Sequence, residues 1–440
     1  MNKSLACFFI TLFISATSYA QPNLINSGND DLRKMLKNIS ENPLITGDST
    51  YKILTTWNTY PPVQQTGKEY LYILKDSIFG EVPFKIFIPK AYKNTIPSAM
   101  VLLLHGAVGQ SHFENAYKAT EKGDDIFFDY LSEKNIIIVR PFADPSKKFN
   151  WVVNKQRLET NPTYTTLTNA ISNLKEFLNI DDNKVFAYGH SDGADGAFAL
   201  DVYNPSQFAG FVCYNSMFTN IFANDIYLEN TKNRKLYVVH SDLDDLRPIQ
   251  QTRLITHVLD SMHVPMEYKE YAGYQHYDKH LEKDLPNSNA FLMAAERQPF
   301  AKHIYWQTSN SNNASCDWVC ISGFNVSLDK ADWHTDINVP TYDKNKGMYM
   351  DYLYYHNNPG AAAYASYSNN IFEIQSSRAT ELEVRVNPSM INTAKQISIN
   401  VNGSNVYKGT VEFDKTYLLT QFNASFDRKA LWMKAIKVKS

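Results

Sequence analysis

Short apolar runs alternate with helix-like segments through the middle of the chain. Near-continuous apolar segments occur at residues 99–104, 135–139, 184–188, 208–214 and 235–240. Such runs are typical of strands that are covered on both faces. Between the second and third runs, apolar residues recur at helical spacing, at Leu167, Ala170, Ile171, Leu174 and Leu178. Strands that alternate with helices predict βαβ units, and therefore an α/β fold with a mostly parallel sheet and helices on both faces.

The pattern changes towards both ends of the chain. Residues 21–67 are polar and irregular, with one or two amphipathic turns near Leu32, and we interpret them as an N-terminal extension. Beyond residue 299, segments such as 382–386 and 397–401 alternate with period two, and Asn402-Gly403 is a hairpin signal. We therefore expect an α/β domain over residues 68–298 and a β-sandwich-like accessory domain over residues 299–440.

The first twenty residues have the pattern of a secretory signal peptide. Lys3 precedes a mostly apolar run over residues 5–14, and Ser18 and Ala20 supply small residues at a cleavage site. The run is too short to span a bilayer. This pattern predicts cleavage after Ala20 and a periplasmic or secreted protein.

Charge and cysteine content narrow the function classes. The 43 basic and 45 acidic residues give a net charge of −2 without basic clusters, which argues against nucleic acid or a membrane surface as partner. Cys316 and Cys320 flank three residues, a spacing that predicts a small disulfide loop in an oxidising compartment. A metal site there would need two further ligands, and none is obvious nearby. Cys213 lies in an apolar strand and is expected to be a buried thiol.

The most informative motif joins a strand to a helix. Gly189-His-Ser-Asp-Gly193 follows the apolar run that ends at Tyr188 and precedes a small-residue helix start at residues 194–200. Gly-x-Ser-x-Gly at such a junction is typical of a nucleophile elbow, a sharp turn that exposes a serine at the carboxyl edge of the sheet. Ser191 is therefore the candidate nucleophile.

A serine hydroxyl needs an imidazole base and an acid that orients the imidazole. Candidates follow Ser191 in the chain order acid then histidine. Asp242, Asp244 and Asp245 come after the strand that ends at His240, and His276 ends a later strand and turn.

With these motifs in place, residues 68–290 resemble the α/β-hydrolase superfamily, and specifically its secreted bacterial esterases of the feruloyl, acetyl or polyhydroxybutyrate-depolymerase kind. Residues 240–244 resemble the family's His-Gly-x-x-Asp turn, with serine in place of glycine, and residues 271–276 resemble its Tyr-Pro-Gly-x-x-His turn. The resemblance implies a triad of Ser191, Asp244 and His276 and no cofactor. Asp242 and Asp245 remain alternatives for the acid.

The same resemblance implies an oxyanion hole. One N–H comes from Asp192, the residue after the nucleophile, and the other from Ala107 in the loop that begins at His105 and resembles the family's His-Gly-x loop. We interpret His105 as a structural histidine that braces this loop. His276 and His280 also stand four residues apart, as in zinc sites, but no general-base glutamate lies between them.

Substrate pockets in this fold are built from loops at the carboxyl ends of the strands. Candidate substrate-binding residues are therefore Phe142, Asn150 and Trp151, with Asp144 as a further polar contact, together with Tyr274 in the histidine turn. The connection between residues 214 and 235 is too short for a large cap, which indicates an open cleft. The C-terminal region has two interpretations: it contacts a glycan through Trp306, Trp318 or Trp333, or it braces the α/β domain. We favour bracing, because tryptophan is also an ordinary residue of a sandwich core.

These observations predict a serine carboxylic-ester hydrolase that acts through an acyl-enzyme intermediate on small or polymer-linked esters, such as acyl or feruloyl esters of polysaccharide. Two alternatives stay open. One is a serine peptidase of the prolyl-oligopeptidase-like type, because amides pass through the same kind of intermediate. The other is a non-catalytic glycan-binding protein on a hydrolase scaffold.

Overall fold

The structure of the protein, a computed structural model, describes residues 28–152, 161–218, 225–350 and 358–440. The predicted signal peptide, residues 1–20, lies outside the described residues. Within those ranges, no helix combines the length and the apolar character that crossing a bilayer requires.

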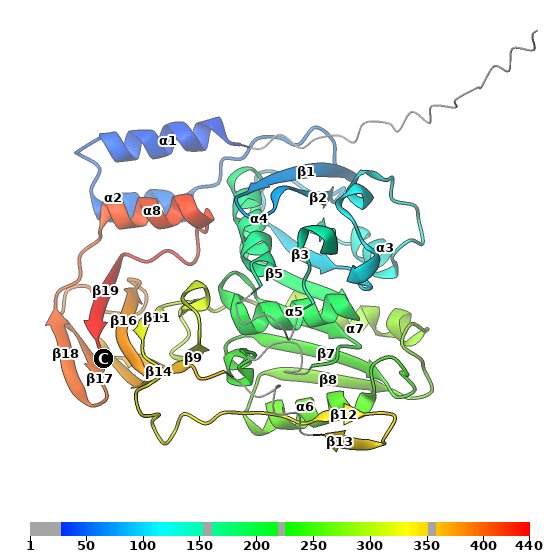
Figure 1. Ribbon diagram of the computed structural model, residues 1–440. Helices are drawn as coiled ribbons and strands as arrows, with labels where there is room; N and C mark the ends of the chain where they lie inside the picture. Colours follow the sequence, from blue (N-terminus) through cyan, green and yellow to red (C-terminus); the bar gives the residue numbers. More distant parts are fainter. Residues whose placement is uncertain (1–27, 153–160, 219–224, 351–357) are drawn as a thin grey trace, which may run out of the picture.

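A mixed eight-stranded sheet forms the centre of the larger domain (Figure 1). Its strand order is β1-β2-β4-β3-β5-β6-β7-β8. β2 runs antiparallel to β1 and β4, and the remaining neighbours are parallel. This order, with its antiparallel second strand, is that of the α/β-hydrolase fold, so the predicted fold class is confirmed. The strands are β1 (Lys68–Asp76), β2 (Gly80–Ile88), β3 (Ser98–Leu104), β4 (Ile136–Pro141), β5 (Ile180–His190), β6 (Gly210–Tyr214), β7 (Lys235–Ser241) and β8 (Met266–Tyr271).

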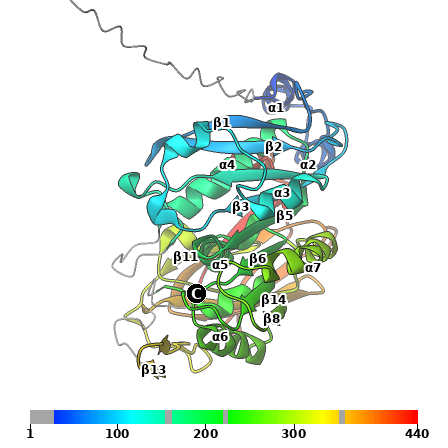
Figure 2. The same ribbon diagram turned by 90° about the vertical axis from the view of Figure 1, so that its right-hand side faces the viewer.

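Helices cover both faces of this sheet (Figure 2). Successive side chains of a strand point to opposite faces, and β3 supplies both cores. Leu102 and Leu104 belong to the core that contains residues of α4, α5 and α6, whereas Val101 and Leu103 pack with residues of α3 and α7. The near-continuous apolar pattern of β3 follows from this double burial. The helices are α3 (Ile126–Ser132), α4 (Thr163–Phe177), α5 (Asp192–Tyr203), α6 (Ile249–Ser261) and α7 (His280–Ala294).

The second region is a β-sandwich with its own core. A four-stranded sheet, β10-β11-β16-β19, packs on a five-stranded sheet, β18-β17-β15-β14-β9. Trp306 and Trp318 are fully buried in this core, so the suggestion that they contact a glycan is wrong, whereas Trp333 is half-buried. The strands are β9 (His303–Thr308), β10 (Ser315–Cys316), β11 (Val319–Phe324), β14 (Ala361–Ser368), β15 (Ile371–Ser377), β16 (Ala379–Val386), β17 (Ile397–Val401), β18 (Ser404–Gly409) and β19 (Lys434–Lys439).

The predicted disulfide between Cys316 and Cys320 is wrong, because both thiols are free. The two cysteines lie on the β10–β11 hairpin, where Cys316 pairs with Val319 and Cys320 pairs with Ser315. Directly paired residues share a face and successive residues alternate. Cys316 and Cys320 therefore point to opposite faces, and only Cys316 enters the sandwich core. Cys213 is fully buried, as expected.

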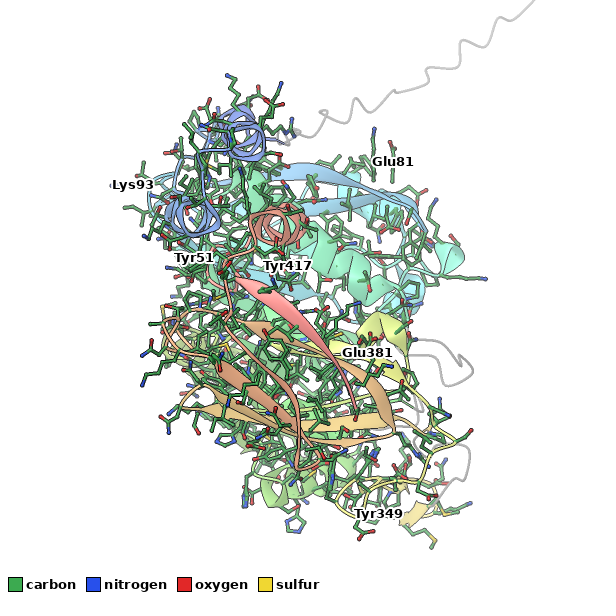
Figure 3. The ribbon with its side chains drawn as sticks, turned by 90° about the vertical axis from the view of Figure 1, so that its left-hand side faces the viewer. Tyr51, Glu81, Lys93, Tyr349, Glu381 and Tyr417 are labelled. Carbon is green, nitrogen blue, oxygen red and sulfur yellow. The ribbon has the colours of Figure 1, made fainter. Side chains whose placement is uncertain are left out.

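The N-terminal extension folds into two helices, α1 (Asp30–Glu41) and α2 (Gly47–Thr56), which pack with α8 (Lys415–Ser425) around a small apolar core. Figure 3 shows α2 and α8, on which Tyr51 and Tyr417 are labelled, side by side above the sandwich. The amide Nδ2 of Asn387, which follows β16, donates to the Tyr51 hydroxyl at 3.1 Å. The extension is thus joined to the C-terminal region.

Buried ion pairs fasten the two large regions together. Asp427, just beyond α8, accepts from Arg297 at 2.7 Å and from Lys175 of α4 at 3.2 Å. Lys175 also lies 3.0 Å from Asp182 of β5. All four side chains are nearly fully buried. Removing Asp427 would leave the buried Arg297 guanidinium without its ion-pair partner, whereas Lys175 would keep Asp182.

A hairpin from the C-terminal region reaches the α/β domain. It is formed by β12 (Thr341–Asp343) and β13 (Met348–Met350) and lies beside α6 (Figure 1). Tyr342 donates its N–H to Gln251 of α6 at 2.8 Å, and Lys344 donates to the carbonyl of Asp245 at 2.6 Å. The C-terminal region therefore contacts the loop that carries the candidate triad acid.

Candidate active site

Ser191 stands at the corner between β5 and α5, in a backbone conformation with φ 58° and ψ −126°. A non-glycine residue adopts such a conformation only where its surroundings enforce it. The flanking glycines explain the turn. A Cβ on Gly189 would lie 2.2 Å from the Gly193 carbonyl carbon, and a Cβ on Gly193 would lie 2.0 Å from the Leu104 oxygen. Both positions therefore require glycine, which accounts for the Gly-x-Ser-x-Gly pattern.

The structure brings Ser191, His276 and Asp244 together. The His276 Nε2 atom lies 2.9 Å from Ser191 Oγ, and its Nδ1 atom lies 2.7 Å from Asp244 Oδ2. Asp244 lies in the loop after β7, and His276 lies between β8 and α7. His276 and Asp244 are buried, whereas Ser191 is partly exposed. The hydroxyl is thus accessible, while its hydrogen-bond partners are shielded from water.

Asp242, Asp244 and Asp245 differ in what their side chains contact, and only Asp244 contacts His276. Although burial alone would raise it, the pKa of Asp244 is held well below its usual range by hydrogen bonds from His240, His276 and Asn215 and from the Arg247 N–H. Asp242 instead accepts the Gly273 N–H at 2.6 Å, and Asp245 is exposed. Asp244 is therefore the ionised carboxylate that faces His276.

Two loops meet where an oxyanion would form. Ala107 has a left-handed backbone, with φ 49°, at the start of the short 3-10 helix Val108–Gln110. A Cβ on its neighbour Gly106 would lie 3.9 Å from Ser191 Oγ, so this loop passes directly over the serine. The Val108 N–H is already bound by the Asp192 carboxylate at 3.0 Å. The Val108 N–H is thus not available as the loop donor, and the roles of Ala107 and Asp192 as oxyanion donors stay a prediction.

Arg247 connects the acid loop to the nucleophile helix. Its guanidinium is buried and pairs with both Asp192 and Asp195 of α5. Its backbone N–H donates to Asp244 Oδ1 at 2.8 Å. One residue therefore links Asp244, α5 and, through Asp192, the loop that contains Val108.

Two further histidines have supporting positions. His105 accepts the Ala143 N–H at Nε2, 3.1 Å away, so its proton is on Nδ1 and is donated to the Gly106 carbonyl at 2.7 Å. Burial lowers the pKa of His105, and the ring braces the oxyanion loop. His190 donates from Nε2 to the His276 carbonyl at 2.9 Å, and burial, then the neighbouring His276, lower its pKa to about 3. His190 therefore orients the His276 backbone and does not face Ser191.

The predicted substrate-binding residues differ in how deeply they are buried. Trp151 is fully buried, with its ring against Gly196 and its Nε1 donating to the His105 carbonyl at 3.1 Å. The prediction that it forms a pocket wall is therefore wrong, since Gly196 leaves a slot in α5 that the indole fills. Phe142 and Asn150 are half-buried in the loop after β4, and their contact with substrate stays a prediction.

Tyr274 is also half-buried and contacts α7, where its ring lies 5.7 Å from that of His280 and 4.6 Å from Lys283 Nζ. Its role in substrate binding stays a prediction. The two imidazoles of His276 and His280, which a zinc site would bring onto one ion, face separate partners. His276 is held by Ser191 and Asp244, and His280 lies 3.0 Å from Asn215.

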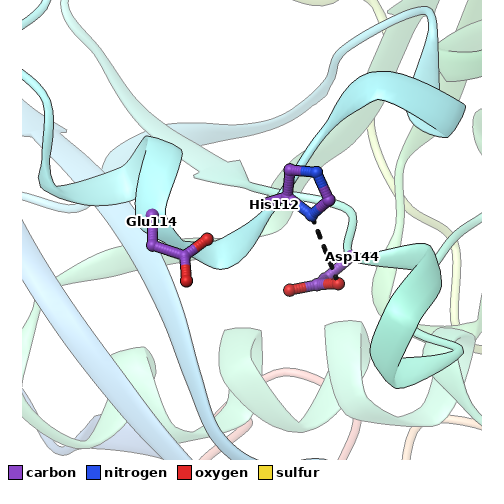
Figure 4. Close-up of side chains that lie close together, drawn as sticks. All are labelled: His112, Glu114 and Asp144. Atoms are coloured by element: carbon purple, nitrogen blue, oxygen red, sulfur yellow. Dashed lines mark ion pairs between the residues drawn. The ribbon is translucent and has the colours of Figure 1, made fainter.

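Another cluster lies beside the oxyanion loop. His112, Glu114 and Asp144 offer ligand atoms that are all within 4.8 Å of one another, and His112 Nδ1 lies 3.7 Å from Asp144 (Figure 4). The Asp144 carboxylate, however, already accepts the N–H groups of Ser146 at 3.1 Å and Phe113 at 3.2 Å. We therefore interpret Asp144 as a brace between two loops, which replaces its predicted role as a substrate contact.

No protein-family model matches the chain, and no curated protein matches it either. Among solved structures, a thermostable esterase is 20% identical over 52% of this chain and 63% of that chain, with a TM-score of 0.44. The dipeptidyl peptidase 4 of Porphyromonas gingivalis is 12% identical over 52% of this chain and 36% of that one, with a TM-score of 0.41. The matched region thus spans less than two thirds of each.

An S-formylglutathione hydrolase from Agrobacterium tumefaciens is 13% identical over 51% of this chain and 94% of that chain, with a TM-score of 0.40. Similarities this remote carry no argument about activity.

Proposed function

We propose that the protein is a serine hydrolase that cleaves carboxylic esters through an acyl-enzyme intermediate. The observation that carries this proposal is the continuous hydrogen-bond path from Ser191 Oγ through His276 to Asp244, with distances of 2.9 and 2.7 Å. In it, each group can perform one step of acyl transfer.

His276 Nε2 removes the Ser191 proton while Oγ attacks the ester carbonyl carbon. The carbonyl oxygen becomes negative and accepts hydrogen bonds from the Ala107 and Asp192 N–H groups. The intermediate collapses as His276 returns the proton to the departing alkoxide, so an alcohol leaves and an acyl-serine ester remains. Water, deprotonated by the same imidazole, then releases the carboxylic acid and restores Ser191. Asp244 fixes the tautomer of His276 and stabilises the imidazolium.

For the substrate, we infer an acyl or feruloyl ester linked to a polysaccharide, met outside the cytoplasm. The signal-peptide pattern of residues 1–20 supports export. The absence of a large insertion between β6 and β7 supports a cleft open to a bulky substrate. A glycan contact by the C-terminal region would have to use groups other than the buried Trp306 and Trp318.

A panel of p-nitrophenyl acetate, p-nitrophenyl butyrate, a feruloyl ester and a chromogenic peptide tests the proposal. We expect turnover of at least one ester, its loss in Ser191→Ala, and its retention in Ser111→Ala. Ser111 is a matched control because its hydroxyl is buried and has no hydrogen-bond partner among the described residues. Turnover of the peptide alone would favour the peptidase, and ester turnover that survives Ser191→Ala would overturn the proposal.

A further inference from the structure

Besides His276, the side chain of Asn215 binds the Asp244 carboxylate, and the His280 imidazole in turn contacts Asn215. Asn215 follows β6 with a left-handed backbone, φ 50°, and its N–H donates to the Val239 carbonyl at 2.8 Å. Its side-chain Nδ2 donates to Asp244 Oδ2 at 2.7 Å, the same oxygen that accepts the hydrogen bond from His276 Nδ1. Asn215 thus acts on the acceptor atom of the triad itself.

The orientation of the Asn215 amide follows from its neighbours. An ionised carboxylate can only accept, so the NH2 group must face Asp244. Nδ2 donates its second proton to Ser241 Oγ, 2.8 Å from the nitrogen, and the Ser241 hydroxyl donates to the Gln275 carbonyl at 2.9 Å. The amide oxygen is therefore turned to His280, whose Nε2 lies 3.0 Å away and must carry the proton.

His280 is completely buried at the start of α7. Its Nδ1 has no hydrogen-bond partner among the described residues. Burial lowers the pKa of His280 to about 4, with charged or titratable neighbours at Asp278, His240, Asp244 and His276. The imidazole is consequently a neutral donor with a fixed tautomer at the pH where a histidine base works.

These contacts form an unbroken chain of hydrogen bonds from His280 through Asn215, Asp244 and His276 to Ser191. We propose that Asn215 and His280 are positioning residues that hold Asp244 Oδ2 towards His276 and set the basicity of that imidazole. This inference rests on the proposed function. Neither residue touches the reacting atoms, and both act through the carboxylate.

The direction of the effect follows from charge. Without the Asn215 donor, Asp244 Oδ2 retains more negative charge and stabilises the His276 imidazolium more strongly. The pKa that governs the acid limb of kcat/KM should then rise. The imidazole would also be less well oriented, so kcat should fall about 10-fold, the effect of one hydrogen bond, while KM changes little.

The experiment compares Asn215→Leu and His280→Leu with His280→Gln, whose amide NH2 can replace the Nε2–H donor. His334→Leu is the matched control, because His334 is also buried, also has a lowered pKa of about 4 and has an unpartnered Nε2, but belongs to the C-terminal region. Thermal unfolding of each variant is measured first. The kcat, KM and pH profile on a p-nitrophenyl ester then follow, with an NMR pH titration of the His276 ring.

We expect Asn215→Leu and His280→Leu to raise the pKa seen in the pH profile and in the His276 titration. His280→Gln and His334→Leu should match the wild type in both measurements. An unchanged His276 titration in folded Asn215→Leu would overturn the inference, as would an equal shift in His334→Leu. The NMR titration needs no turnover. If the wild-type protein hydrolyses no ester, the proposed function fails while the positioning role is still decided by the His276 resonance.

Discussion

Val108 donates its backbone N–H to the carboxylate of Asp192 at 3.0 Å, which ties the oxyanion loop to the residue that follows the nucleophile. The same carboxylate pairs with Arg247 from the acid loop. One side chain at the start of α5 therefore holds the loops that follow β3 and β7. Catalysis by an oxyanion hole depends on donors fixed before charge develops, and this arrangement supplies that rigidity.

Arg247→Met should therefore reduce kcat by 10-fold or more and leave KM within a factor of about two. It should also lower the free energy of unfolding by about 3–5 kcal/mol, because Asp192 and Asp195 lose their buried partner. Steady-state kinetics and urea unfolding measure both effects. Arg253→Met is the control, since Arg253 pairs with Glu270 at the surface, where ion pairs contribute about 0–1 kcal/mol. Equal losses of kcat and of unfolding free energy in the two variants would contradict the proposed role of Arg247 in holding Asp192 and Asp195.

Gly193→Ala should prevent correct closure of the nucleophile corner. The added methyl would lie 2.0 Å from the Leu104 oxygen, and both backbones would have to move. We expect a loss of about 3 kcal/mol in unfolding free energy and no measurable hydrolysis. Gly109→Ala, in the neighbouring loop, has no atom within 4 Å of the added carbon and should behave like the wild type. A fully active Gly193→Ala would show that the corner differs from the one described.

Acid should weaken the fold through its buried histidines. Burial lowers the pKa of His280 to about 4, whereas an unfolded histidine titrates near 6.5. Between these values the unfolded chain binds a proton that the folded chain does not, so the free energy of unfolding falls as the pH drops from about 6.5 to 4. Urea titrations of His280→Gln across this window should give a shallower slope. The exposed His257→Gln should leave the slope unchanged.

Asp427→Ala should lower the free energy of unfolding, because Asp427 joins the C-terminal region to the α/β domain through Arg297 and Lys175. Although burial opposes it, Arg297 and Lys175 hold the pKa of Asp427 far below its usual range. Its contribution is therefore present above about pH 4 and is lost as the pH falls further. At pH 7 we expect a loss of about 3–5 kcal/mol. Asp48→Ala, which breaks the surface pair with Lys52, should lose less than about 1 kcal/mol by the same urea assay.

Much of this architecture could be predicted from local patterns. The apolar runs locate the central strands because double burial leaves few polar positions, and the glycines around Ser191 mark a turn that no other residue allows. The acid could not be chosen locally, since Asp242, Asp244 and Asp245 differ only in where the folded loop directs them. Asn215 was missed because its partners come from β7, the acid loop and α7. One available signal was a polar residue placed directly after an apolar strand.

The wrong predictions have equally physical causes. A tryptophan in a loop at the carboxyl edge of the sheet is typical of a pocket wall, but Trp151 fills the slot that Gly196 leaves. A Cys-x-x-x-Cys spacing permits a disulfide, yet the pairing of Cys316 with Val319 turns the second thiol to the other face. In both cases the decisive information is the position of a neighbouring element, which the spacing in the sequence does not contain.

The central claim is that His276 activates the hydroxyl of Ser191. The most direct test is the rate at which a fluorophosphonate forms a covalent adduct, with the site identified by peptide mass spectrometry. We predict one adduct per chain on Ser191, none in Ser191→Ala, and a labelling rate at least 100-fold lower in His276→Ala. An adduct on another residue, or an equal rate in His276→Ala, would contradict the account.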